Sequence, residues 1–178
     1  EYHRLKRDMA QAVGRIFRVG GKRDIARHHG DREIFAIEKE KIFMREWLCM
    51  ARAEEIAVPG DYMTFRVMGE PLIVTRNNQD EVRAFANVCA HRGVEVASGE
   101  GNLEEFSCPY HGWLYDLKGN LQGVPFMKNV KDFDFKNCRL KTLGTAIWAG
   151  FIFINFYLNN KISEQTRDGN LGLAIRAF

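Results

Sequence analysis

Two short segments that each carry a cysteine, a histidine and a glycine constrain the fold of this chain most strongly. The first supplies Cys89 and His91, and the second supplies Cys108 and His111. Each segment directly follows a stretch of strand-like residues, so a β fold that brings the two loops together would present all four side chains at one point. Thiolates and imidazoles are common metal ligands. The sequence therefore predicts one metal site that is shared by the two segments.

The spacing of the four donors distinguishes between two kinds of metal site. Two thiolates and two imidazoles suit either a structural zinc ion or a Rieske-type [2Fe–2S] cluster. Zinc hairpins place about two to four residues between paired ligands, whereas a single residue separates Cys89 from His91. In a Rieske cluster one iron binds both cysteines and the other binds both histidines, so each segment spans the cluster. The spacing favours the cluster, with Cys89, His91, Cys108 and His111 as its ligands.

The chain between residues 59 and 156 reads as many short strands that are separated by turns. Strands are expected at residues 62–68, 72–76, 82–88, 103–107, 113–117, 121–124, 140–143, 146–148 and 151–156. Polar residues 77–80 predict a hairpin between the second and third strands, and residues 118–120 predict another tight turn. This segmentation predicts a mainly β fold, an antiparallel barrel or sandwich.

The two ends of the chain have a different character. The segment between His3 and His29 contains eight Lys and Arg but only two Asp. This excess of positive charge predicts a solvated basic arm or a docking surface for an acidic partner or a neighbouring subunit. Helical spacing of apolar residues predicts a helix over 38–48. We therefore expect a basic arm and helical N-terminal extension at 1–58, a cluster domain at 59–158, and a tail or the start of a further catalytic domain at 159–178.

Composition argues against two classes of function and suggests a compartment. A net charge of +3 over 178 residues is smaller than expected for a dedicated nucleic-acid binder. No apolar run reaches the length of about 18 residues that a membrane helix needs. Cys49 and Cys138 lie outside the metal-ligand pattern, and without a secretory signal they are expected to be buried free thiols in a reducing compartment. The expected location is the cytoplasm, with neither nucleic acid nor a membrane as a partner.

The two metal-binding segments resemble those of the Rieske domain in the alpha (large) subunits of aromatic-ring-hydroxylating oxygenases. The resemblance covers residues 84–93 and 101–119 around the ligands. It extends upstream to residues 59–62 and downstream to residues 148–155, with good coverage from about residue 33 to 156. The resemblance implies a Rieske-type antiparallel β fold.

The resemblance also implies roles for individual residues and partners. Cys89 and Cys108 would hold a buried iron and His91 and His111 an outer iron, while Arg92, Tyr110 and Trp113 would surround the cluster. Electrons would come from a ferredoxin or a flavin reductase. They would pass to a mononuclear non-heme iron in the next subunit of a homotrimer or of an alpha/beta hetero-oligomer.

The histidines mark a departure from the whole oxygenase. Its mononuclear iron needs two histidines and a carboxylate, but no histidine follows His111, and the other three are His3, His28 and His29. The last two are adjacent in the basic arm and are expected to face solvent. The chain is therefore expected to be the N-terminal electron-transfer part of an oxygenase, as a fragment, a truncated product or a separately encoded half, and to lack that catalytic iron site.

Two alternatives remain open for the function of the chain. One is a self-contained Rieske ferredoxin that carries electrons between a reductase and an oxygenase. The other is a zinc-stabilised binding module without a redox role. The roughly 60 residues before the β region favour the oxygenase part over the ferredoxin, because typical Rieske ferredoxins begin close to their first strand.

Overall fold

A computed structural model describes residues 31–125 and 137–157 of the chain. The basic arm with His3, His28 and His29, and the segment 159–178, lie outside the described residues. The chain divides into two compact units, with the boundary between Ile42 and Phe43. Among the described residues, no helix combines the length and hydropathy that crossing a bilayer would require.

Helical structure begins earlier than the sequence pattern predicts. Helix α3 spans Arg32–Glu38, and a π-helical turn follows at Lys39–Phe43. Asp31 starts the helix because its carboxylate accepts hydrogen bonds from the backbone N–H groups of Glu33 and Ile34, at 2.8 and 3.4 Å. The helix predicted over 38–48 is therefore wrong in its second half, where the chain leaves the helical conformation.

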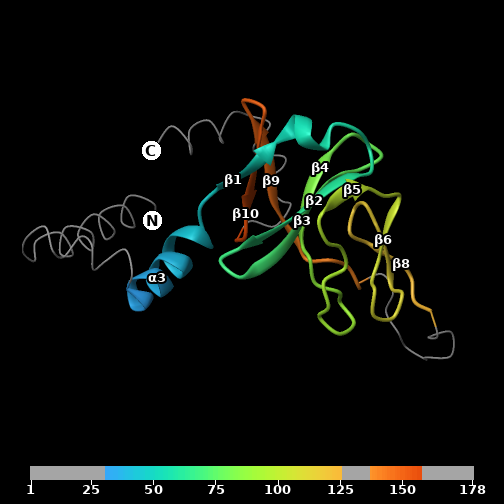
Figure 1. Ribbon diagram of the computed structural model, residues 1–178, viewed down its shortest axis with the longest axis horizontal. Helices are drawn as coiled ribbons and strands as arrows, with labels where there is room; N and C mark the ends of the chain where they lie inside the picture. The colour runs from blue at the N-terminus through green and yellow to red at the C-terminus, as the bar shows by residue number, and fades with distance from the viewer. Residues whose placement is uncertain (1–30, 126–136, 158–178) are drawn as a thin grey trace, which may run out of the picture. The chain divides into compact units, whose positions relative to one another are not determined.

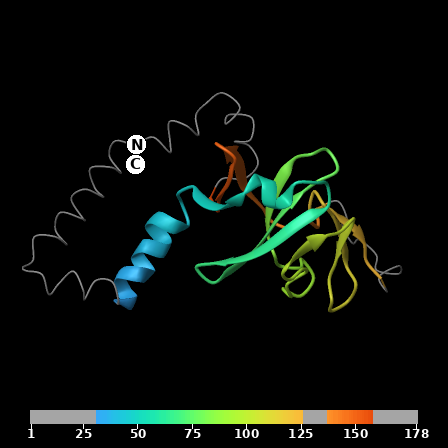
Figure 2. The same ribbon diagram turned by 45° about the horizontal axis from the view of Figure 1, so that its top comes forward.

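The second unit is built from antiparallel strands, which confirms the mainly β fold. Among the described residues, seven strands form one sheet in the order β1-β10-β9-β4-β3-β2-β5, and three form a smaller sheet in the order β6-β7-β8, which lies beside the β5 edge of the larger one (Figures 1 and 2). The strands are β1 (Leu48–Arg52), β2 (Asp61–Val67), β3 (Glu70–Arg76), β4 (Val82–Ala86), β5 (Glu100–Asn102), β6 (Glu105–Ser107), β7 (Leu114–Asp116), β8 (Leu121–Gly123), β9 (Thr142–Trp148) and β10 (Phe151–Asn155).

Strand β1 lies in the segment that the sequence assigned to a helical extension. Its residues pair with β10, Leu48 with Ile154 and Arg52 with Phe151, and a 3₁₀ turn at Ala53–Ile56 follows it. The β architecture thus begins at Leu48 rather than at residue 59. Pairing with a distant strand outweighs the helical spacing of the apolar residues.

The predicted hairpins agree with the observed pairing. Strands β3 and β4 pair around residues 77–81, and β7 and β8 pair around residues 117–120. The long apolar stretch from residue 145 to 156 forms most of the hairpin β9–β10. The two strands expected at 140–143 and 146–148 are one strand in the structure, because β9 runs continuously from Thr142 to Trp148. Strand β5 was not predicted, since its residues Glu100–Asn102 are all exposed.

Two apolar cores stabilise the second unit. One lies within the larger sheet and comprises Ile56, Leu72, Val74, Ala84, Leu143, Ile152 and Ile154. The other joins the smaller sheet to strands β3 and β4 and comprises Ile73, Phe85, Cys89, Val96, Phe106, Cys108, Trp113, Tyr115, Leu117, Leu121 and Leu140. The second core includes both cysteines of the predicted metal site. Packing of the two sheets therefore determines where the metal-binding loops lie.

None of the four cysteines forms a disulfide, which agrees with the prediction of free thiols at Cys49 and Cys138, but the four differ in burial. Cys89 and Cys108 are almost fully buried. Cys138 is half-buried and packs against the second core, whereas Cys49 is exposed on the edge strand β1. The prediction that Cys49 is buried is therefore wrong.

Candidate metal centre

The two loops that carry the predicted ligands have the same backbone frame. In the first loop, which follows β4, the N–H of Cys89 donates to the carbonyl of Val94 and the N–H of Gly93 donates to the carbonyl of Cys89. In the second loop, which follows β6, the N–H of Cys108 donates to the carbonyl of Trp113, and the N–H of Gly112 donates to the carbonyl of Cys108. All four distances are 2.8 or 2.9 Å. Each cysteine therefore begins a closed turn that ends five residues later.

A glycine is required at the same place in each frame. Gly93 has φ of 74° and Gly112 has φ of 67°, a left-handed conformation that L-residues with a Cβ rarely adopt. A Cβ at Gly93 would meet no other described atom within 4 Å. The constraint that the structure shows at this glycine is therefore the backbone conformation of the turn.

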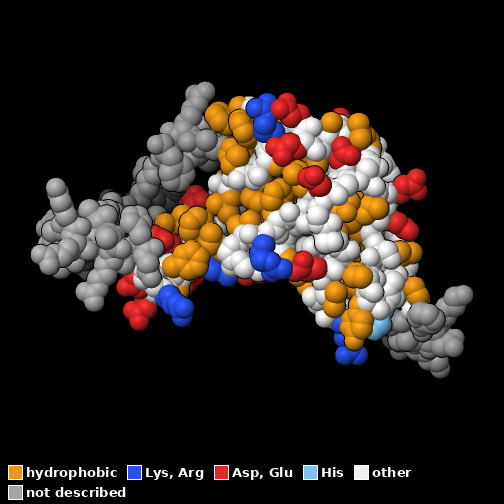
Figure 3. Space-filling model, in the orientation of Figure 1, with side chains coloured by type: hydrophobic (Ala, Val, Ile, Leu, Met, Phe, Trp, Pro, Cys, Tyr) orange, Lys and Arg blue, Asp and Glu red, His pale blue; other side chains and the backbone are white. Residues whose placement is uncertain are grey.

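The two loops bring their histidines together, and both of their cysteines belong to one apolar core. The imidazole rings of His91 and His111 have centroids 4.6 Å apart, and pale blue histidine surface is visible at the lower edge of the second unit (Figure 3). The Nδ1 atoms of both rings are buried, and no atom of the described chain forms a hydrogen bond with either. An unpaired buried nitrogen costs about 1–3 kcal/mol. A metal ion that accepts both lone pairs would remove this cost, so the residues present fit a metal centre.

The donors of the two loops, one cysteine and one histidine in each, form the set that a two-iron Rieske cluster takes. A structural zinc site takes about four protein ligands around a single ion. A Rieske cluster takes two protein ligands at each iron and bridges the irons with sulfide. Two imidazoles with adjacent rings and two buried thiols, one of each on each loop, supply the donors that the second kind of site takes.

Aromatic side chains hold the two imidazoles in different ways. The indole of Trp113 is buried and stacks on His91, with ring centroids 4.6 Å apart and planes inclined by 6°. The phenol of Tyr110 is exposed and lies 3.8 Å from the His111 ring. Two of the three residues expected around the cluster therefore contact a predicted ligand directly. Trp113 fixes the orientation of one imidazole from inside, and Tyr110 covers the other from outside.

His91 is in the protonation state that metal binding needs. Desolvation, followed by the proximity of His111 and Arg92, lowers the pKa of His91 below its usual value. The ring is therefore neutral at pH 7, and its nitrogen is available as a ligand without release of a proton. Arg92, the third residue expected around the cluster, is exposed and influences His91 through its charge.

Tyr115, on strand β7 directly after the second loop, contacts the first loop through its hydroxyl group. The oxygen accepts a hydrogen bond from the N–H of Ala90 at 3.0 Å and lies 3.2 Å from Sγ of Cys89. Burial raises the pKa of Tyr115 well above its usual value, so the hydroxyl keeps its proton at neutral pH. With Cys89 ionised as an iron ligand, its sulfur could only accept, and the Tyr115 hydroxyl would be the donor of this hydrogen bond.

The Tyr115→Phe substitution is expected to lower the reduction potential of the bound cluster. A hydrogen bond to a ligand sulfur stabilises the more negative, reduced state. Its loss is expected to lower the reduction potential by roughly 30–100 mV. For a one-electron couple, about 59 mV corresponds to a tenfold change in the equilibrium constant. Redox titration of the visible spectrum measures the shift. Tyr62→Phe is the control because the Tyr62 hydroxyl lies 3.3 Å from the carbonyl of Ser98; an equal shift in both variants would contradict the role of Tyr115.

The Asn87 side chain forms three hydrogen bonds that hold the two ends of the first loop together. It is 1% exposed, and its Oδ1 accepts hydrogen bonds from the N–H groups of Val96 and Ala97, at 2.8 and 3.1 Å. Its Nδ2 donates to the carbonyl of Ala97 at 2.8 Å. One side chain thus fixes both ends of the segment from residue 87 to 97, which contains Cys89 and His91.

No role for Asn87 or Tyr115 was predicted from the sequence. Both lie within the ranges 84–93 and 101–119 that resemble the oxygenases. For Tyr115 the sequence signal was its place at the centre of the strand expected at 113–117. A tyrosine that is buried there needs a hydrogen-bond partner for its hydroxyl group. For Asn87 the signal was a polar residue directly after a buried strand, where amides often bind a following turn.

Comparison with protein families assigns the class of this domain. The family model of the Rieske [2Fe-2S] domain matches residues 46–134, which include both loops. The chain therefore belongs to the Rieske [2Fe–2S] domain family.

Individual relatives place the domain within larger proteins. The chain is 40% identical over 145 residues to the carnitine monooxygenase oxygenase subunit of Escherichia coli K12. It is 46% identical over 129 residues to the large oxygenase component of the naphthalene 1,2-dioxygenase system of Pseudomonas aeruginosa. These matches cover 81% and 70% of this chain but only 39% and 29% of the relatives. The chain thus spans well under half of the length of the curated relatives it matches.

Solved structures agree with this placement. A quaternary ammonium Rieske monooxygenase in complex with L-carnitine superposes with a TM-score of 0.71 at 39% identity, over 82% of this chain and 41% of that chain. Naphthalene 1,2-dioxygenase with indole bound superposes with a TM-score of 0.68 at 39% identity, over 72% and 30% of the two chains. Both superpositions confirm the Rieske fold of the second unit.

Proposed function

We propose that this chain is the electron-transfer part of a Rieske non-heme iron oxygenase large subunit. Cys89 and Cys108 would hold one iron of a [2Fe–2S] cluster, and His91 and His111 would hold the other. When bound, such a cluster accepts and releases one electron at a potential of roughly −150 to +300 mV. The observation that carries the proposal is the pair of buried, unpaired imidazole nitrogens on two loops that each also carry a buried free thiol.

The side chains around the site have separate tasks in this function. Trp113 orients the His91 ring, and Tyr115 donates to Cys89 and so makes the reduced state more stable. The Tyr110 and His111 pair lies at the surface, where an imidazole edge gives an electron a short path out of the protein. Asn87 keeps the first loop in the conformation in which its two ligands face the second loop.

The relatives support the wider context of the proposal. In a whole oxygenase, electrons would arrive from a ferredoxin or a flavin reductase and leave toward a mononuclear iron in a catalytic part, within a homotrimer or an alpha/beta hetero-oligomer in the cytoplasm. A self-contained Rieske ferredoxin is less well supported, because the relatives reported above are oxygenase components.

The relatives divide between two substrate classes. One group oxidises carnitine, and the other belongs to naphthalene dioxygenase systems, at similar identities of 40% and 46%. Aromatic hydrocarbon catabolism is therefore one of two proposals for the whole protein. We infer that the Rieske part does not choose the substrate, since both classes use closely similar versions of it.

Reconstitution with iron and sulfide tests the proposed function. The expected product is red-brown, holds about two irons and two sulfides per chain, and loses visible absorbance on reduction with dithionite. Electron paramagnetic resonance of the reduced protein should show mixed thiolate and imidazole ligation. A colourless protein that retains one zinc ion per chain would overturn the redox function.

A further inference from the structure

An apolar face lies near the tip of the hairpin β9–β10. Its aromatic members Trp148 and Phe151 stand opposite each other in the strand register, and their side chains are 40% and 39% exposed. Phe153 belongs to the same face, since its ring centroid lies 6.4 Å from that of Trp148. Hydrophobic side chains gather over this end of the second unit (Figure 3). A group of exposed apolar side chains on a soluble protein commonly marks an interaction surface.

The edge strand β1 extends this face. Cys49 stands opposite Phe153 and Arg52 stands opposite Phe151, and both β1 residues are exposed. Residues that stand opposite each other on antiparallel strands project from the same side of the sheet. We call this feature the Trp148 face, and it comprises Cys49, Arg52, Trp148, Phe151 and Phe153.

The charges at the border of the Trp148 face are balanced. Arg52 forms an ion pair with Glu54, and its guanidinium lies 5.6 Å from the ring centroid of Phe151. In a two-fold symmetric contact, Arg52 of one copy can approach Glu54 of the other while the aromatic rings meet at the centre. The face is therefore complementary to a second copy of itself, as a symmetric dimer contact requires.

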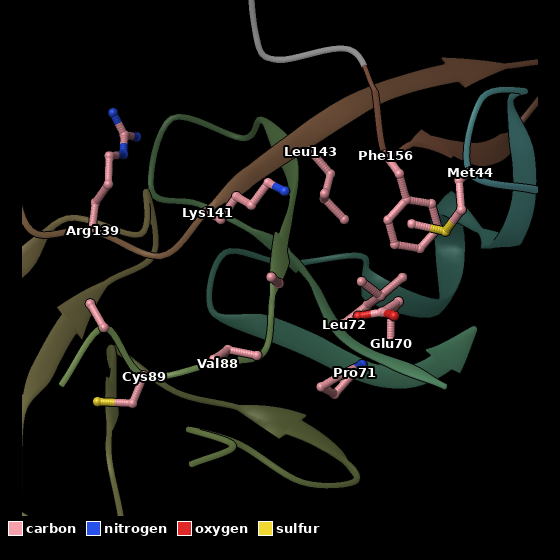
Figure 4. Close-up of a pocket in the computed structure, with 12 residues that line it drawn as sticks. Met44, Glu70, Pro71, Leu72, Val88, Cys89, Arg139, Lys141, Leu143 and Phe156 are labelled. Atoms are coloured by element: carbon pink, nitrogen blue, oxygen red, sulfur yellow. The ribbon is translucent and has the colours of Figure 1, made fainter. Parts of the chain in front are cut away.

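Two other concave surfaces of the second unit lack this balance. A groove of about 360 Å³ beside the first metal-binding loop is lined by Arg139 and Lys141 against one carboxylate, Glu70 (Figure 4). A cavity of about 430 Å³ beside the second loop is lined by Glu95 and Glu105. Two copies that met through either surface would bring like charges together, which disfavours association. The Trp148 face suits a second copy better than these two surfaces do.

We propose that the Trp148 face binds a second copy of this chain through a two-fold symmetric contact. The contact would bury the aromatic rings of both copies together with the thiol of Cys49, a residue type that is usually buried. The face is small, and weak contacts bury less than about 1,200 Å². We expect a dissociation constant of roughly 10–100 µM. The inference goes beyond the proposed function, because the contact uses no residue of the metal centre.

The contact would leave the metal centre open. Strand β9 begins beside β4, where Leu143 pairs with Ala84, and β4 leads into the first metal-binding loop. At about 3.3 Å per residue, the path along β9 from Leu143 to Trp148 is roughly 17 Å. Two copies joined at the Trp148 face would therefore keep their metal-binding loops at the far ends of β9, where each cluster can still meet its redox partners.

Sedimentation velocity of the cluster-loaded chain, from roughly 1 to 200 µM, tests the contact. The test variant is Trp148→Lys and the control is Leu103→Lys, because both side chains are 40% exposed and both changes add one positive charge. Leu103 lines the cavity beside the second loop. We expect the unmodified chain and the control to approach the mass of two chains, with dissociation constants within about twofold of each other. The test variant should associate at least about tenfold more weakly.

Alkylation of Cys49 is a second measurement, made on chains that keep Trp148. In a Cys138→Ser chain with its cluster bound, Cys49 is the cysteine left free to react. We expect its alkylation rate to fall at least about fivefold between roughly 2 and 200 µM protein, because the contact would bury the thiol. Adding Trp148→Lys should make this rate independent of concentration.

The other outcomes overturn the proposal. An assembly larger than a dimer, or equal weakening by both lysine variants or by neither, would exclude the two-fold contact. A monomer whose Cys49 reacts at every concentration would leave the face to a different protein, and a monomer whose Cys49 does not react would mean that the chain covers the face itself. The visible spectrum of the same samples tests the proposed function separately, since its absence would contradict the cluster and not the sedimentation result.

Discussion

The Cys108→Ser chain is expected to lose its iron–sulfur absorbance, whereas Cys49→Ser and Cys138→Ser chains keep theirs. A serine hydroxyl does not ionise at neutral pH and cannot replace the thiolate at an iron. Substitution of residues that merely support metal ligands commonly costs about 10–100-fold in affinity, so loss of a ligand should cost more. We expect iron and sulfide below roughly a tenth of the unmodified content, measured by chemical analysis and visible spectroscopy.

The three cysteines form a matched set for this experiment. Each substitution replaces one sulfur by oxygen, but only Cys108 lies in a metal-binding loop; Cys49 is on β1, and Cys138 packs beside the second core. His111→Ala should reproduce the loss that Cys108→Ser causes. A normal spectrum in either of these two variants, or a missing spectrum in Cys49→Ser, would rule out the ligand assignment.

The Asn87→Ala chain is expected to be less stable by about 2–4 kcal/mol and to release its cluster faster. The substitution removes three hydrogen bonds and leaves the N–H groups of Val96 and Ala97 and one carbonyl without their partner. Each unpaired buried group costs about 1–3 kcal/mol, and partial access of water to Ala97 reduces the sum. Urea unfolding gives the stability, and the rate of bleaching in excess chelator reports on the first loop.

Asn102→Ala is the control for this prediction. The Asn102 amide also donates two hydrogen bonds, to the carbonyl of Pro59 and to Oδ1 of Asp61, but it is exposed. Water can replace those bonds, so we expect a loss below about 1 kcal/mol and no effect on cluster release. If Asn87→Ala unfolds within about 0.5 kcal/mol of the unmodified chain, Asn87 does not hold the loop.

The sequence predicted the parts of this fold that depend on local pattern. Alternating apolar residues and the turn residues at 77–80 and 118–120 predicted the hairpins β3–β4 and β7–β8 because register and turn chemistry act over a few residues. The conclusion that the chain contains a Rieske domain is confirmed by the family match over residues 46–134. The assignment of Cys89, His91, Cys108 and His111 as ligands stays a prediction, for which the geometry is favourable.

Features that depend on distant partners were not predictable in the same way. Leu48 has a helical apolar pattern before it, but its pairing with Ile154 makes it part of a strand. Cys49 was expected inside because cysteine is commonly buried, yet β1 is an edge strand and its second residue faces outward. The contact between the Tyr115 hydroxyl and Cys89 Sγ joins residues 26 positions apart. No local pattern encodes such a contact.

The two unpaired imidazole nitrogens have a consequence for the lifetime of the protein in the cell. A folded chain without metal keeps both polar atoms buried and unsatisfied, so iron starvation should increase the fraction of open molecules that proteases can cut. Newly made chains that obtain iron and sulfide would survive, and the rest would be degraded. Abundance of this protein should therefore follow the supply of iron even when its synthesis is constant.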